Sequence, residues 1–148
     1  MSGLDTAFED ADDSTGLLLW QVTNRWQAAQ RAALKPFGLT HVQFVLLASL
    51  TWLAGTTQEP VTQRRLADHA ATDPMMTSQV VRALADRGWI TREPHATDRR
   101  AIVLAATAEG RALVNRAVHA VEGVDEAFFA ALGDRRAGFT KALRTLRG

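Results

Sequence analysis

Apolar side chains recur at spacings of three and four residues in the first part of the chain, which predicts an amphipathic helix over about residues 14–35. Pro36 and Gly38 end this helix, because proline disfavours the helical conformation in the residue before it and glycine suits the turn that follows. The apolar stripe of the helix consists of Leu19, Val22, Trp26, Ala29 and Ala33.

A second helix is predicted to begin at Thr40, which forms a T-x-x-Q capping box with Gln43, and to run to about Leu53. Apolar residues occupy nearly every side of this helix, so we expect it to be buried. A polar loop over residues 55–60 follows it.

Two short helices are predicted next. Thr62 is placed to cap the first of them, and Asp73 and Pro74 are typical of the cap and first position of the second, where the missing N–H of proline costs nothing. The second of these helices runs to about residue 87, and Gly88 ends it. The inward residues of the first are Leu66, Ala67 and Ala70.

The pattern then changes to extended chain. Residues 89–92 and 101–105 are strand-like runs joined by a polar turn over residues 93–100, which predicts a β-hairpin. Thr107 caps a fifth helix of about 25 residues, and a last helix passes through Phe139, Leu143 and Leu146. The apolar stripe of the fifth helix consists of Leu113, Ala117, Val121, Val124 and Phe128.

Two short helices with a tight turn, followed by a hairpin with an arginine-rich tip, are typical of a winged helix-turn-helix. We therefore expect a mainly α fold with a small β-hairpin wing (α+β), flanked by dimerisation helices. In the second short helix Thr77, Val80, Val81 and Leu84 share one face, so the opposite face is offered to DNA. That opposite face consists of Met75, Ser78, Gln79, Arg82 and Asp86.

The outward residue types suit the reading of bases. Gln79 can pair bidentately with adenine, Ser78 can reach several base edges, and Met75 can contact a thymine methyl. Arg82 can reach a guanine or a phosphate. The alternative is a solvated helix face on which Arg82 forms an i, i+4 pair with Asp86.

Asp98, Arg99 and Arg100 lie together in the hairpin turn, and arginine is favoured where the minor groove narrows. Asp98 can hold one guanidinium in place; the alternative is a polar turn in which it accepts only from local backbone donors. With the start of the third helix included, the candidate DNA contacts are Thr62, Met75, Met76, Ser78, Gln79, Arg82, Asp98, Arg99 and Arg100.

Composition fits a globular, helix-rich protein, with 148 residues of which 47% are apolar and 22% charged. Residues 1–13 hold five acidic side chains and no basic ones, so we expect a disordered acidic tail before a mildly basic body. This start is unlike a signal peptide, and no apolar run is long enough to cross a bilayer. We therefore expect a cytoplasmic protein with no membrane partner.

Catalytic and metal-binding patterns are missing from the sequence. It contains no cysteine, which excludes disulfides and thiolate metal sites. No G-x-S-x-G, P-loop or H-E-x-x-H motif is present, so we expect neither enzymatic activity nor a cofactor. The four histidines have no partner at i, i+3 or i, i+4, which argues against a metal site: His41, His69, His95 and His119.

From Asp73 to Gly110 the chain resembles, without a gap, the MarR family of transcription regulators. The likeness is carried by L-A-D-R-G-W-I at 84–90, D-R-R at 98–100, T-A-E-G at 107–110 and L-T-x-x-Q-F at 39–44, and in element order it extends from residue 17 to 148. The resemblance implies an obligate dimer, the fourth helix in the major groove, and release from DNA by small ligands. The family often has arginine where Gln79 stands and leucine where Ala106 stands, so the base contact at Gln79 is not carried over.

We expect residues 14–148 to form one domain, with a DNA-binding lobe over about 40–106 and dimerisation helices over about 14–35 and 107–147. The apolar stripes of the first and last helices exceed what one winged-helix lobe of about 75 residues can bury, which itself indicates a homodimer.

An effector site is predicted from two residues. Trp20 lies off the stripe of the first helix, and His41 occupies the first position of the second helix, where the helix dipole and free N–H groups attract anions. Together they can hold a small aromatic or anionic ligand. The alternative is that Trp20 covers part of the dimer core and His41 is exposed.

These observations predict a ligand-responsive repressor that binds a pseudo-palindromic operator in double-stranded DNA as a homodimer. The alternative is a winged-helix protein-interaction module without specific DNA binding, which would lack steep salt dependence on DNA.

Overall fold

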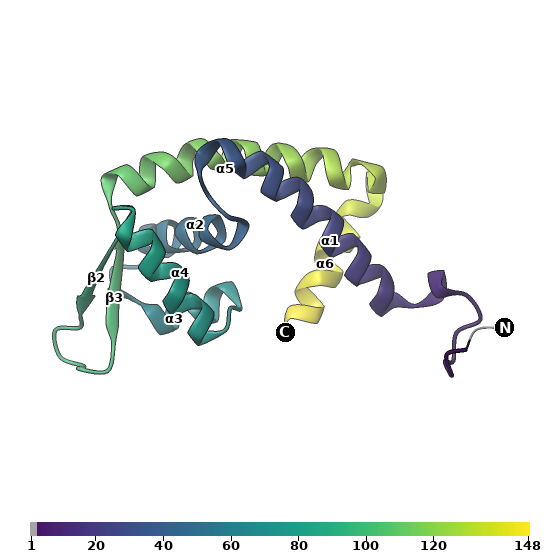
Figure 1. The fold of residues 1–148 in the computed structure, drawn as a ribbon, viewed down its shortest axis with the longest axis horizontal. Coiled ribbons are helices and arrows are strands. Elements are labelled where there is room, and N and C mark those ends of the chain that lie inside the picture. Colours follow the sequence, from purple (N-terminus) through teal and green to yellow (C-terminus); the bar gives the residue numbers. More distant parts are fainter. Residues whose placement is uncertain (1–2) are drawn as a thin grey trace.

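A computed structural model describes residues 3–148 and shows a mainly helical chain with a small three-stranded antiparallel sheet. The expected fold class is confirmed (Figure 1). The helices are α1 Thr15–Leu34, α2 His41–Thr56, α3 Gln63–Ala70, α4 Pro74–Asp86, α5 Ala108–Phe129 and α6 Arg136–Arg147. The strands are β1 Val61–Thr62, β2 Ile90–Pro94 and β3 Ile102–Ala106, and short 3-10 segments lie at Ala11–Asp13, Lys35–Phe37 and Ala130–Arg135.

Side-chain caps set where five of the helices begin. In each case the cap oxygen accepts a hydrogen bond from the backbone N–H three residues later, which satisfies a donor that the helix leaves unpaired. Four of the five were predicted from the sequence, including the full capping box of Thr40 and Gln43. The cap residues are Ser14, Thr40, Thr62, Asp73 and Thr107.

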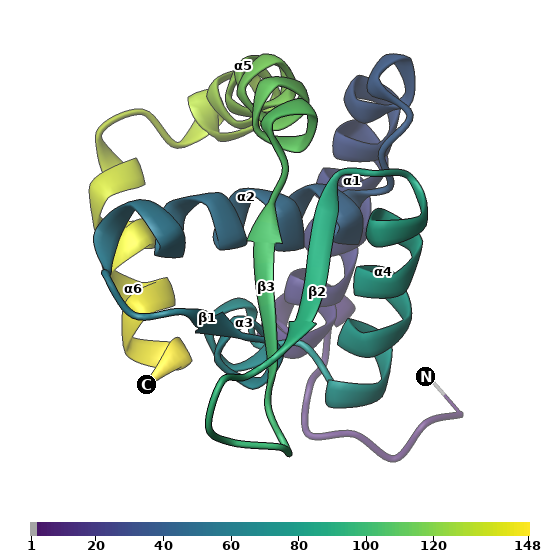
Figure 2. The same cartoon turned by 90° about the vertical axis from the view of Figure 1, so that its left-hand side faces the viewer.

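The core surrounds α2. Leu46, Leu47 and Leu50 are fully buried, which confirms the burial predicted for this helix. Leu66 of α3, Val81 and Leu84 of α4 and the buried stripe of α5 pack into the same cluster. Helix α2 therefore links α3 and α4 to the long helix α5 that crosses above it (Figure 2).

The sheet has the order β1-β3-β2, and all pairs are antiparallel. The predicted hairpin is confirmed, with Ile90 opposite Ala106 and Pro94 opposite Ile102. Strand β1 was not predicted, because two residues that pair Val61 with Leu104 leave no alternation to detect.

The start of α5 lies against the base of the wing. The N–H of Thr107 donates to the carbonyl of Trp89 at 3.0 Å, and its hydroxyl donates to the carbonyl of Gly88 at 2.7 Å. A Cβ at Gly110 would collide with the carbonyl oxygen of Trp89, so only glycine permits this approach. The first turn of α5 therefore fixes the direction in which the wing leaves the lobe.

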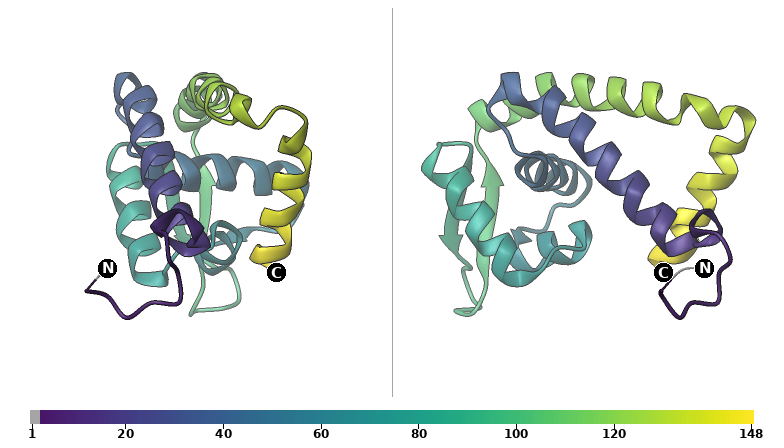
Figure 3. Two further views of the ribbon diagram at one scale, coloured as in Figure 1. Left: turned by 90° about the vertical axis from the view of Figure 1, so that its right-hand side faces the viewer. Right: turned by 45° about the vertical axis from the view of Figure 1, so that its right-hand side comes forward.

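Helices α1 and α5 extend away from the short helices and the sheet; the N-terminal segment lies at the far end, and α6 runs back from there towards the middle of the molecule (Figures 1 and 3). Helix α5 is shorter than predicted, because a 3-10 segment follows Phe129 and the chain turns at Gly133 with φ 54°. Exposed apolar side chains gather on α1 and α6: Leu17, Leu18, Leu19, Trp20, Val22, Leu143 and Leu146.

The acidic segment contains one ordered turn among the described residues, the 3-10 helix Ala11–Asp13, which Asp10 caps. Its disorder in solution and the division of the chain into lobes stay predictions. Within residues 3–148 no single helix is long and apolar enough to cross a membrane, although the bent pair Thr15–Phe37 and His41–Thr56 passes that test by length and composition together.

Candidate nucleic-acid interface

Helix α4 presents a sharply divided surface. Thr77, Val81 and Leu84 are buried against the core, whereas Gln79 and Arg82 are exposed and Met75 is 72% exposed. The predicted separation of an inner and an outer face is confirmed. The outer side chains are free to enter a groove of about the width that accommodates a helix.

Hydrogen bonds fix the turn that leads into α4. Asp73 accepts from the N–H of Met76 at 2.8 Å, and the buried hydroxyl of Thr77 donates to the carbonyl of Asp73 at 2.8 Å. The hydroxyls of Thr72 and Thr77 also lie 2.7 Å apart. These bonds hold the turn against the first turn of α4 and leave the buried hydroxyl of Thr77 with a partner.

The tip of the wing is organised by His95, which sequence reasoning missed. Its Nδ1 accepts from the N–H groups of Thr97 at 3.2 Å and Asp98 at 3.0 Å. Asp98 in turn accepts from the N–H of Arg100 at 3.0 Å. The structure therefore shows the alternative in which Asp98 accepts from local backbone donors. Arg99 and Arg100 remain exposed at the tip.

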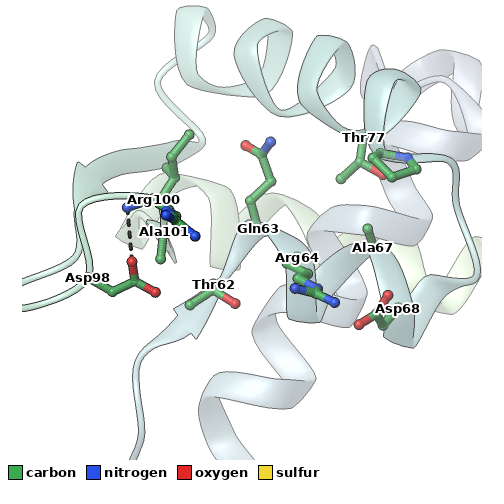
Figure 4. A pocket seen from close by; sticks show the side chains of 11 residues that line it. Thr62, Gln63, Arg64, Ala67, Asp68, Thr77, Asp98, Arg100 and Ala101 are labelled. Carbon is green, nitrogen blue, oxygen red and sulfur yellow. Dashed lines mark hydrogen bonds between the residues drawn. The ribbon is translucent and has the colours of Figure 1, made fainter.

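A cleft of about 790 Å³ separates the wing from the two short helices (Figure 4). Thr62, Gln63 and Arg64 line it from the start of α3, Pro74 and Thr77 from α4, and Asp98 and Arg100 from the wing. Gln63 stands between Arg100 and Thr77, and its buried Oε1 has no hydrogen-bond partner. Nothing in the sequence pattern marks Gln63 or Arg64 beyond their place after a helix cap.

Of the predicted contacts, Thr62 and the wing residues Asp98 and Arg100 line this cleft, whereas the predicted contacts on α4 and Arg99 do not. The hydroxyl of Thr62 already accepts from the N–H of Arg65 at 3.2 Å. Met76 is 38% exposed and Ser78 is partly buried.

The arginines of this surface are not neutralised by carboxylates. Within residues 3–148 the only ion pair joins Arg136 and Glu126, far along the chain from the interface. The alternative pair between Arg82 and Asp86 is therefore not formed. Free guanidinium groups beside a cleft and an exposed helix face are what a phosphate backbone requires.

Comparison with known proteins identifies this architecture. The MarR family model matches residues 39–102, which span α2 to the start of β3. The HTH-type transcriptional regulator YdcH of Bacillus subtilis is 44% identical over 124 residues, 84% of this chain and 84% of that protein. The HTH-type transcriptional repressor Rv2887 of Mycobacterium tuberculosis is 35% identical over 123 residues, 82% of this chain and 85% of that protein.

The chain belongs to the MarR family. The fold agrees: CouR from Rhodococcus jostii, in its structure with p-coumaroyl-CoA, superposes with a TM-score of 0.79 and 28% identity over 95% of this chain and 96% of that one. The chain is therefore a DNA-binding transcription regulator with a winged helix-turn-helix, and not an enzyme.

The two predicted effector contacts of this MarR-family chain do not meet. Trp20 is 67% exposed on α1, whereas the ring of His41 packs edge-on against Trp26 with centroids 5.0 Å apart. His41 is half-buried rather than exposed. Burial lowers the pKa of His41; Asp125 opposes this shift and Arg31 adds to it.

A buried polar network surrounds this ring contact, and sequence reasoning missed it. Trp26 Nε1 and Gln30 Nε2 both donate to one carboxylate oxygen of Asp125, at 2.8 and 2.9 Å. Gln30 is fully buried and its Oε1 has no partner. The network ties α1 and α5 together beside the start of α2. Among the described residues no cluster of three His, Asp or Glu side chains is arranged to hold a metal ion.

Proposed function

We propose that this MarR-family regulator is a repressor that binds a pseudo-palindromic operator as a homodimer, and that a small molecule tunes its affinity. The observation that carries the proposal is the arrangement of α4 and the wing. The tip of the wing and the N-terminal end of α4 lie at the same end of the lobe (Figure 2), so one duplex can contact both.

Helix α4 supplies the base contacts in this proposal. Gln79 is exposed on the outer face, and its amide can pair with an adenine edge in the major groove. Ser78, Met75 and Met76 contact neighbouring base edges or methyl groups, and Arg82 contacts a guanine or a phosphate.

The wing and the start of α3 supply the contacts that position the lobe. Arg99 and Arg100 enter the minor groove from the exposed tip, and the phosphate backbone passes along the cleft beside Arg64. Thr62 stays at the cleft as the cap of α3. Asp98 acts by holding the tip through its bond to the Arg100 backbone rather than by touching DNA.

The homodimer is supported by the exposed apolar side chains on α1 and α6. Leu19 is 53% exposed, Trp20 67% and Leu146 78%, and such a patch marks an interface. A two-fold arrangement of two lobes requires two half-sites related by the same symmetry, which is why the operator is pseudo-palindromic.

The effector is a small aromatic or anionic molecule in this proposal. CouR, a structural relative, binds p-coumaroyl-CoA. His41 and Trp26 lie where α2 meets the long helices, so a ligand there would shift the DNA-binding lobe. Trp20 would contact such a ligand only from the exposed apolar surface of α1 that faces the second protomer.

We also propose that the protein acts in the cytoplasm, where its DNA is. Selection of bound fragments from genomic DNA tests the function, followed by anisotropy titrations on the recovered sequence and a scrambled duplex. A single symmetric sequence bound at least about 1,000-fold more tightly than the scrambled duplex is expected. Equal affinity for both duplexes would overturn the proposal and favour a protein-interaction module.

A further inference from the structure

Helix α6 has the surface of a docking site. No residue of α6 is buried, and Leu143 and Leu146 continue an apolar stripe from the partly buried Phe139. Helical spacing places Arg147 beside this stripe, one turn after Leu143, and Arg144 next to Arg147 but farther round the helix, so the two form a basic flank. Neither of these arginines has an ion pair within residues 3–148, since the pair of Arg136 and Glu126 stands alone there.

The N-terminal segment has the complementary surface. Its five carboxylates come with no basic residue, and among the described residues none of them forms an ion pair. Phe8 is 48% exposed in their midst. The two ends of the chain are therefore an acidic segment with an apolar side chain and an amphipathic helix with a basic flank.

The two surfaces lie on opposite sides of one chain (Figure 3, left), in the half of the molecule that is away from the sheet (Figure 1). Two lobes that present α4 and the wing to one duplex are related by a two-fold axis that points towards that duplex. The wing points downwards in Figure 1, so this axis is close to vertical in that view. A rotation of 180° about such an axis exchanges the side of the molecule that carries the N-terminal segment with the side that carries α6. It brings the N-terminal segment of a second copy to the side on which α6 lies.

We propose that the acidic N-terminal segment of one chain, residues 3–13, binds the Arg144–Arg147 flank and apolar stripe of α6 in a second copy of the chain. The contact is isologous and occurs twice in each dimer. It rests on the dimer proposed above and assigns a function to two segments that the DNA contacts leave unused. Its electrostatic part weakens as salt rises, because both charge clusters are exposed.

Charge reversal tests this contact. Arg144→Glu with Arg147→Glu, and separately Glu9→Lys with Asp12→Lys, each raise the dimer dissociation constant about tenfold at low salt, because attraction is replaced by repulsion at two symmetric sites. The four substitutions together return the constant to within about threefold of the parent. Sedimentation of labelled protein at about 50 mM salt measures all four constants.

The matched control is Arg116→Glu with Lys141→Glu, which makes the same change in charge on the exposed surface of α5 and on the side of α6 away from the stripe. It changes the constant less than about threefold. An effect as large as that of Arg144 and Arg147 would refute the contact, and so would a combined variant weaker than either of its parents.

A second measurement covers the case in which a variant does not fold. The parent chain and a chain that lacks residues 2–13 are compared from about 50 to 500 mM salt, and only the parent loses dimer stability steeply. Equal salt slopes would overturn the proposal. A parent chain that is monomeric throughout would instead overturn the proposed dimer itself.

Discussion

Gly110→Ala probes how the structure aims the wing. The added methyl group meets the carbonyl of Trp89, a backbone group held by the N–H of Thr107 at 3.0 Å, so the contact cannot be relieved by a side-chain rotation. Overpacking of this kind costs about 1–3 kcal/mol. The higher helix propensity of alanine returns about 1 kcal/mol, which leaves a net loss of up to about 2 kcal/mol.

Urea unfolding followed by circular dichroism measures this loss. Gly55→Ala is the matched control, because Gly55 also lies in a helix and has open space where the methyl group would be. That control gains about 0.5 kcal/mol. A Gly110 variant as stable as the Gly55 variant would show that the close packing of α5 on the wing is not what holds the wing in place.

Two other substitutions test the network beside α2. Asp125→Ala leaves Trp26 Nε1 and the buried Gln30 Nε2 without their acceptor, so the free energy of unfolding falls by about 2–3 kcal/mol in the same urea assay, whereas substitution of an exposed carboxylate such as Glu122 changes it little. The pKa of His41 is lower in the folded chain than its ordinary value of 6.5, so the unfolded chain binds more protons near and below pH 6.5 and the free energy of unfolding falls as the pH drops through that region. His41→Asn is expected to show a smaller fall between about pH 7.5 and 5.5. An identical pH profile would show that His41 does not have a lowered pKa in the folded chain.

Local signals explain which parts of the fold were predictable. Caps such as Thr40 and Asp73 act within three residues, so the sequence shows them directly. The buried face of α4 follows from helical spacing alone. Strand β1 was missed and the length of α5 was overestimated, because a two-residue strand and the 3-10 segment after Phe129 have no periodic signal.

The site was predictable only in part, for the same reason. The exposed side chains of α4 and the wing follow from local pattern, whereas the bond between Gln30 and Asp125 joins residues 95 positions apart. The partner of His41 depends on how α1 crosses α2, so the ring meets Trp26 and not Trp20. Long-range packing decides such contacts, and spacing along the chain does not contain it.

One titration series tests the central claim that α4 reads bases while the wing positions the protein. Gln79→Ala weakens binding to the selected operator by about 1–3 kcal/mol and leaves binding to a scrambled duplex nearly unchanged. Arg100→Ala weakens binding to both duplexes and lowers the salt slope by about two for the dimer. Arg116→Ala, an exposed substitution on α5, changes neither.

Fluorescence anisotropy of these three variants on both duplexes, over a salt series, is the most direct measurement. We expect Gln79→Ala to lower the ratio of specific to non-specific affinity, and Arg100→Ala to preserve this ratio while flattening the salt dependence. A Gln79 variant with an unchanged ratio would show that α4 does not read bases through Gln79, and an Arg100 variant with unchanged affinity for both duplexes would remove the wing from the interface.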